Sequence, residues 1–133
     1  MNRQVLIIED DKLNCLLHRK ICTKAGLPEP VVFYNGKEAL EYIEEQLNDA
    51  IDLLILLDIN MPVMNGWEFL DNLPAARHSP NTFIAIVSSS FSEADRAKAQ
   101  QYNLVLEYFV KPFSIAQLRK LLNQPFLNVF KEA

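Results

Sequence analysis

The sequence has little that would suggest a membrane, secreted or nucleic-acid-binding protein. No apolar run approaches the roughly 18 residues that a membrane-spanning helix requires. Residues 1–4 lead straight into a strand-like run without a small-residue cleavage site, so we expect no signal peptide and a cytoplasmic protein. The net charge is −4, whereas nucleic-acid-binding surfaces normally carry a clustered basic patch. We therefore expect neither a membrane nor a nucleic acid as partner.

Cysteine and histidine are also scarce, with two of each. Cys15 and Cys22 fall in one predicted helix, about 10 Å apart along its axis, which is too far for a disulfide. A metal or redox site would need more ligands nearby, so we expect both thiols to pack against the core. His18 lies in the same helix and His78 in a loop, and we expect surface roles for both rather than ligand roles.

The 133 residues suffice for one globular domain with a substantial core. Half of the residues are hydrophobic and 23% are charged, and the chain shows no repeat, low-complexity segment or internal linker. We assign residues 1–124 to the domain and residues 125–133 to a C-terminal tail. The apolar residues of the tail are expected to pack back on the domain, with contact to a partner as the alternative; they are Phe126, Leu127, Val129 and Phe130.

Apolar runs of strand length alternate with helix-like stretches. The runs occupy residues 5–8, 31–34, 53–57, 83–87 and 105–110, and their consecutive apolar positions indicate strands covered on both faces. Helices are indicated by Leu13, Leu17 and Ile21 at helical spacing, by apolar residues within 39–47, by residues 67–73, and by capping patterns at Ser92 and Ser114. This alternation predicts an α/β fold, a five-stranded parallel sheet with five helices on both faces.

Ligands of such folds bind beyond the carboxyl ends of the strands. In the predicted sheet, the first strand is followed by the acids Glu9, Asp10 and Asp11, and the third by Asp58. The fourth strand ends in the hydroxyls of Ser88 to Ser90, and the fifth is followed by the amine of Lys111. The strand at 31–34 delivers nothing catalytic. The concentration of these groups at one edge predicts the functional site there.

The carboxylates of Glu9, Asp10 and Asp58 would repel each other in one cleft unless a cation were present. Mg²⁺ prefers oxygen ligands and commonly takes one or two carboxylates together with phosphate oxygens. Helix capping is the alternative for some of these acids, since Asp10 or Asp11 could cap the first helix. With a metal in place, an Asp can attack a phosphoryl group and form an acyl phosphate. Lys111 and Ser88 could then hold phosphoryl oxygens, and a cis bond before Pro112 would aim the lysine inward.

Four segments, in this order, resemble the motifs of response-regulator receiver domains. They are the acidic motif Ile7-Ile8-Glu9-Asp10-Asp11, the phosphoacceptor motif from Leu57 to Gly66 (Asp-x-x-Met-Pro-x-x-x-Gly), Val87-Ser88-Ser89, and Val110-Lys111-Pro112-Phe113. The resemblance covers about residues 4 to 123. It implies the flavodoxin-like strand order 2-1-3-4-5 and a chemotaxis-regulator-like, single-domain member of two-component phosphorelay signalling.

The resemblance also implies a role for each matching residue. Asp58 would accept the phosphoryl group from a histidine kinase or a histidine phosphotransfer protein. Mg²⁺ would be held by Glu9, Asp10, Asp58 and the backbone carbonyl of Asn60. Ser88 and Lys111 would occupy the hydroxyl and lysine positions, and Tyr108 the aromatic switch position; taken alone, Tyr108 would be an ordinary surface aromatic of a strand. Among the departures from the commoner pattern, Glu9 replaces Asp and Ser88 replaces Thr.

As a signalling switch, such a domain would be no enzyme beyond its own phosphorylation and dephosphorylation. We expect no output domain after Lys120, and therefore expect a protein partner at the face formed by the fourth helix, fifth strand and fifth helix. The alternative is a receiver cut from a larger hybrid kinase or regulator. An aspartyl-phosphate hydrolase is disfavoured because Asn60 cannot transfer protons, and a flavin carrier because the acids after the first strand would repel the flavin phosphate.

Overall fold

The computed structural model describes residues 3–78 and 80–131, so the first two residues of the predicted domain and the last two of the predicted tail lie outside the described residues. Its strands are β1 (Arg3–Ile8), β2 (Val31–Phe33), β3 (Asp52–Leu57), β4 (Thr82–Ser88) and β5 (Val105–Val110). They form one sheet in the order β2-β1-β3-β4-β5, and every neighbouring pair is parallel. The predicted fold and strand order are confirmed.

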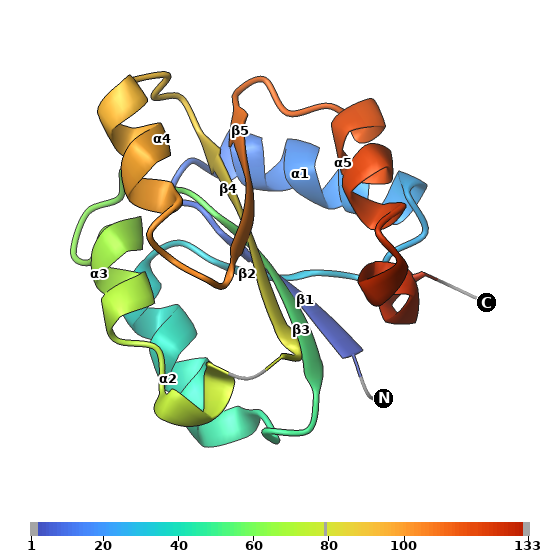
Figure 1. Cartoon of the computed structure of the whole chain (residues 1–133), viewed down its shortest axis with the longest axis horizontal. Helices are drawn as coiled ribbons and strands as arrows, with labels where there is room; N and C mark the ends of the chain where they lie inside the picture. The colour runs from blue at the N-terminus through green and yellow to red at the C-terminus, as the bar shows by residue number, and fades with distance from the viewer. Residues whose placement is uncertain (1–2, 79, 132–133) are drawn as a thin grey trace.

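Helices cover both faces of this sheet (Figure 1). They are α1 (Lys12–Lys24), α2 (Gly36–Gln46), α3 (Gly66–Asp71), α4 (Glu93–Ala99) and α5 (Ile115–Leu122), with short 3₁₀ helices η1 (Ala75–Arg77) and η2 (Pro125–Phe130). Helices α1 and α5 lie on one face, and α2, α3 and α4 on the other. None of the helices in the described part of the chain has the length and apolar character needed to cross a membrane.

The consecutive apolar residues of the central strands serve two cores. Val5 and Leu54 point to a cluster that includes α1, α5 and η2, whereas their neighbours Leu6 and Leu53 point to a cluster with α2 and α3. Residues Leu53 to Leu57 are all essentially inaccessible. Burial on both faces therefore explains why these strands do not alternate apolar with polar residues.

Helix α1 lies where the sequence predicted it, but its buried face is different from the one marked by leucines. Leu13 and Leu17 are 64% and 47% exposed, whereas Cys15 and Cys22 are buried in the core next to α5. Residues 15, 18 and 22 share one face because they are spaced by three and four positions. The prediction that both thiols pack in the core is confirmed.

The surface prediction for His18 is wrong. The side chain is 4% exposed, and its ring packs edge-on against Phe113 with centroids 5.7 Å apart. Burial, assisted by the charge of Lys111, lowers the pKa of His18 to about 4. His18 is therefore a neutral core residue of α1. His78 is exposed, as predicted.

The segment after α5 contributes to the core. Leu127 and Phe130 are fully buried among residues of α1, α5 and the sheet. Phe126 and Val129 are 51% and 40% exposed, although the Phe126 ring stacks on Phe83 with centroids 5.6 Å apart. In the described part of this segment, Leu127 and Phe130 thus attach the chain to the core, while Phe126 and Val129 stay largely exposed.

The loop between β3 and α3 depends on a glycine at its end. The Gly66 amide donates to the carbonyl of Ile59 at 2.8 Å, which folds the loop back on the end of β3. A Cβ at this position would lie 2.7 Å from the carbonyl oxygen of Asp58 and 2.8 Å from Cα of Ile59. Backbone atoms cannot yield as a flexible side chain can, so this close approach requires glycine.

We predict that Gly66→Ala lowers the free energy of unfolding by about 1–3 kcal/mol, because the methyl group must push the loop away from β3. Urea unfolding measures this change. Gly36→Ala is the matched control, since a Cβ there meets the flexible Met64 side chain at 3.2 Å and a backbone oxygen only at 3.3 Å, well beyond the 2.7 Å contact at Gly66. It is expected to change the stability by less than about 0.5 kcal/mol. Equal effects of the two substitutions would contradict this account of the loop.

Candidate functional site

The parallel sheet brings the predicted site residues to one edge. Ile8 pairs with Leu57 in the register of β1 and β3, so Glu9 and Asp58 follow adjacent strand ends. On the other side of β3, Ser88 ends β4, and its carbonyl accepts a hydrogen bond from the Lys111 amide at 2.8 Å. The convergence expected from the sequence is therefore present.

Three carboxylates form a compact cluster at this edge. Glu9, Asp10 and Asp58 each offer an oxygen, and these oxygens all lie within 4.8 Å of one another. Glu9 and Asp58 are only 2% and 5% exposed, whereas Asp10 is open to solvent. Such a set of hard oxygen donors, open on one side, suits a divalent cation.

The sequence left open whether Asp10 or Asp11 caps the first helix, and in the structure Asp11 does so. Its carboxylate accepts hydrogen bonds from the amides of Leu13 and Asn14, at 2.9 and 3.3 Å, and so caps α1. The Asp11 amide in turn donates to Glu9 Oε2 at 3.1 Å. Asp10 is thus left free of capping and belongs to the acidic cluster.

Lys111 supplies a positive charge to the site. Its Nζ lies 2.6 Å from Glu9 Oε1 and 3.8 Å from Asp58 Oδ2, so the ammonium is held mainly by Glu9. The Lys111–Pro112 peptide bond is cis, the isomer considered from the sequence. One ammonium does not balance three carboxylates, and the cluster keeps a net negative charge.

Burial and the neighbouring charges shift the pKa of Asp58. Burial, reinforced by the negative charge of Glu9, raises the pKa of Asp58 to about 7, although Lys111 and a hydrogen bond from the Asn60 amide at 3.4 Å oppose the shift. The ionised carboxylate is consequently poorly stabilised by the protein alone. A cation among these oxygens would relieve the repulsion.

This raised pKa predicts a pH-dependent stability. An acid whose pKa is higher in the folded state destabilises the fold progressively as pH rises from its unfolded value, 3.8, to its folded value, about 7. We predict that Asp58→Asn raises the free energy of unfolding by about 2 kcal/mol at pH 8 in metal-free buffer, and much less at pH 4.

Urea unfolding at the two pH values, with a chelator present, measures this difference. Asp10→Asn is the matched control, because Asp10 is exposed and its neutralisation should change stability less. A gain for Asp58→Asn that is the same at both pH values would contradict a raised pKa at Asp58.

The hydroxyl side of the site extends into the loop after β4. Ser88 is fully buried, and its Oγ accepts a hydrogen bond from the Ser90 amide at 3.1 Å. The Ser90 carbonyl accepts a hydrogen bond from the Tyr108 hydroxyl at 2.8 Å. Tyr108 is 9% exposed, so it is not the ordinary surface aromatic that its sequence position alone suggested.

Sequence reasoning gave no role to two residues that contact this site. Ser90 links Ser88 to Tyr108, and the thiol of Cys15 donates to the carbonyl of Glu9 at 3.1 Å. A run of serines gives no indication of which one accepts from a distant tyrosine. The helical spacing of Cys15 and Cys22 did indicate a buried face, but it did not indicate contact with the acidic motif.

The family model, the similar sequences and the similar structures all belong to response regulators. Residues 5–123 match the family model of the response regulator receiver domain. The chain is 29% identical over 124 residues to the chemotaxis protein CheY of Thermotoga maritima, a match that covers 93% of this chain and 98% of that protein. It is 32% identical over 128 residues to the transcriptional regulatory protein CpxR of Escherichia coli, covering 93% of this chain.

The chain spans about half the length of CpxR, since the match covers 50% of that protein. Among solved structures, a two component response regulator from Cytophaga hutchinsonii superposes with a TM-score of 0.80 and 28% identity. That superposition covers 95% of this chain and 97% of the other. Both the sequence and the backbone are therefore similar to receiver domains over nearly the whole length.

Proposed function

Because this chain belongs to the response regulator receiver domain family, we propose that it is a cytoplasmic signalling domain that accepts a phosphoryl group on Asp58. The observation that carries the proposal is the buried carboxylate of Asp58, grouped with Glu9 and Asp10 and approached by the ammonium of Lys111. The donor would be the phosphohistidine of a histidine kinase or a histidine phosphotransfer protein. The domain would turn over no substrate other than its own phosphoryl group.

The donor set fits Mg²⁺. Oxygens of Glu9, Asp10 and Asp58 lie close enough together to share one ion, and the raised pKa of Asp58 indicates that the protein alone does not stabilise the ionised carboxylate. We assign these three side chains and the backbone carbonyl of Asn60 as the ligands. When bound, the ion would offset the charge of the carboxylates and of the incoming phosphoryl oxygens.

The transfer itself needs few protein groups. An oxygen of Asp58 attacks phosphorus as the bond from phosphorus to the donor imidazole nitrogen breaks, and that nitrogen keeps the electron pair. Lys111, already 3.8 Å from Asp58 Oδ2, would move from Glu9 toward a phosphoryl oxygen. The hydroxyl of Ser88 would donate to another. These contacts position and neutralise the group, which is most of what phosphoryl transfer requires.

The same contacts would carry the signal outward. When the Ser88 hydroxyl donates to a phosphoryl oxygen, its Oγ can still accept from the Ser90 amide, so Ser90 stays where its carbonyl accepts from the Tyr108 hydroxyl. A phosphoryl group that fixes Ser88 would therefore favour the buried Tyr108 ring. The change would reach the surface formed by α4, β5 and α5. We propose that this surface binds a downstream protein partner, with a preference for one of the two states.

We predict that incubation with acetyl phosphate and Mg²⁺ adds the mass of one phosphoryl group to the protein and that Asp58→Asn abolishes the gain. Intact-protein mass spectrometry measures the uptake. Asp11→Asn is the matched control, because asparagine caps a helix as well as aspartate does and Asp11 lies outside the cluster. Unchanged uptake by Asp58→Asn would overturn the assignment of the site.

We further predict that Lys111→Ala keeps Mg²⁺ binding but slows phosphorylation by about 100-fold, because it removes a cation that the transition state needs. Isothermal titration calorimetry measures metal binding, and the mass assay measures the rate. Lys120→Ala, which removes an exposed lysine from α5, serves as the control. Either loss of metal binding or an unchanged phosphorylation rate would contradict the role given to Lys111.

A further inference from the structure

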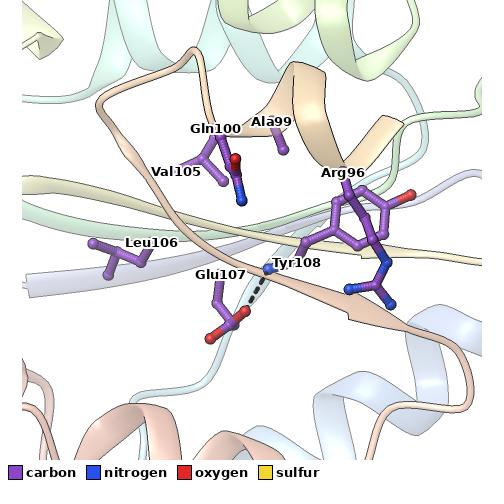
Figure 2. Close-up of a pocket in the computed structure, with 7 residues that line it drawn as sticks. All are labelled: Arg96, Ala99, Gln100, Val105, Leu106, Glu107 and Tyr108. Atoms are coloured by element: carbon purple, nitrogen blue, oxygen red, sulfur yellow. Dashed lines mark hydrogen bonds between the residues drawn. The ribbon is translucent and has the colours of Figure 1, made fainter. Parts of the chain in front are cut away.

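A small pocket separates α4 from β5, close to Tyr108. Its volume is about 200 Å³, and it is lined by Arg96, Ala99 and Gln100 from α4 and by residues 105–108 of β5. Figure 2 shows the Arg96 side chain lying against the Tyr108 ring, while Glu107 points to the other side of the strand. The guanidinium carbon of Arg96 lies 5.3 Å from the ring centroid, a distance typical of a cation–π contact.

The Tyr108 ring is held at both ends. Its hydroxyl donates to the carbonyl of Ser90, and its body belongs to a small apolar cluster with Ile59, Ile86 and Ala99. Arg96 covers the ring from the pocket side and is itself exposed. The ring is therefore buried at a place where one exposed side chain forms part of its cover.

Helix α4 has little apolar attachment to the rest of the domain. Of its seven residues, Ala99 alone is buried. Polar and charged side chains also hold it: Asp95 accepts a hydrogen bond from the Ser90 hydroxyl at 2.5 Å, Arg96 lies over Tyr108, and Nζ of Lys98 lies 4.9 Å from the Trp67 ring centroid. Because so little apolar area anchors it, α4 depends on these contacts for its position.

We propose that Arg96 is a positioning residue that holds the Tyr108 ring in its buried position. A cation over an aromatic ring at an exposed site shifts an equilibrium by about two- to fivefold. Arg96 would therefore raise the ratio of buried to exposed ring by that factor. The same contact ties α4 to β5, so the position of the helix and that of the ring change together.

The buried ring position matters for the phosphorylation site. Only there does the Tyr108 hydroxyl reach Ser90, whose amide donates to Ser88 Oγ. If a phosphoryl group on Asp58 favours the buried ring, then whatever favours the buried ring strengthens binding of a phosphoryl mimic by the same factor. This consequence rests on the proposed function, whereas the placement of Tyr108 by Arg96 does not.

The first measurement uses the full chain without metal or phosphate and with ¹³C-labelled tyrosine rings. The Tyr108 signals are assigned with Tyr108→Phe, and their exposure is measured as relaxation enhancement by a soluble gadolinium chelate. In Arg96→Ala and Arg96→Gln we expect the enhancement at Tyr108 to rise by about two- to fivefold. The χ1 rotamer populations of Tyr108, measured from three-bond couplings, should shift in the same variants, which loss of cover alone would not cause. Arg96→Lys should restore part of the protection, because it restores a cation.

Lys98→Ala is the matched control, since it removes the other cation–π contact of the same helix. It should leave the Tyr108 signals unchanged and affect Tyr102, whose ring stacks on Trp67 with centroids 5.7 Å apart. An unchanged Tyr108 enhancement in both Arg96→Ala and Arg96→Gln would overturn the proposal. So would an equal rise in Lys98→Ala, because that result would indicate general loosening of α4.

The second measurement titrates beryllofluoride, a phosphoryl mimic, in the presence of Mg²⁺. We expect binding to weaken by about two- to fivefold in Arg96→Ala, and we expect no further loss from Arg96→Ala in a Tyr108→Ala background. Equal affinities of wild type and Arg96→Ala would overturn the link to the phosphorylation site. If the wild type bound no beryllofluoride at all, the proposed function would fail, and the tyrosine measurement would still decide the role of Arg96.

Discussion

The burial of two carboxylates side by side, those of Glu9 and Asp58, is the constraint on which the site depends. Parallel strands β1 and β3 place the two groups side by side just beyond their ends, where both side chains are buried. Lys111 offsets part of the charge, yet the pKa of Asp58 still rises to about 7. A bound cation would stabilise the ionised carboxylates of this site. Together with Lys111, the cation could also hold the oxygens of a phosphoryl group.

The surrounding backbone preserves this arrangement. Gly66 lets the loop after β3 fold against the carbonyl of Asp58, and Asp11 caps α1 so that Asp10 is free to face the cluster. On the output side, the attachment is weaker, because α4 buries only Ala99. The well-packed part of the domain therefore carries the acidic site, whereas α4, which is weakly attached, is the element whose position can respond to phosphorylation.

The sequence was sufficient to predict the parallel sheet and the acidic edge, because these follow from apolar runs of strand length and from what ends each run. The strand order came from the resemblance to receiver domains. The sequence misled at α1, where Leu13 and Leu17 are exposed and His18 is buried, because helical spacing alone does not say which of two stripes meets the sheet. The link from Ser88 through Ser90 to Tyr108, and the cover that Arg96 gives, depend on loop path and side-chain rotamer. Residue order does not determine these.

The central claim is that Asp58 is the residue that accepts the phosphoryl group. The most direct measurement is to treat the phosphorylated protein with borohydride, which reduces an acyl phosphate to an alcohol, and to locate the change by peptide mass spectrometry. We predict conversion to homoserine at position 58, dependent on Mg²⁺ and on the phosphodonor. Conversion at position 9 or 10 instead, or none at position 58 in a protein that had gained a phosphoryl group, would contradict the account.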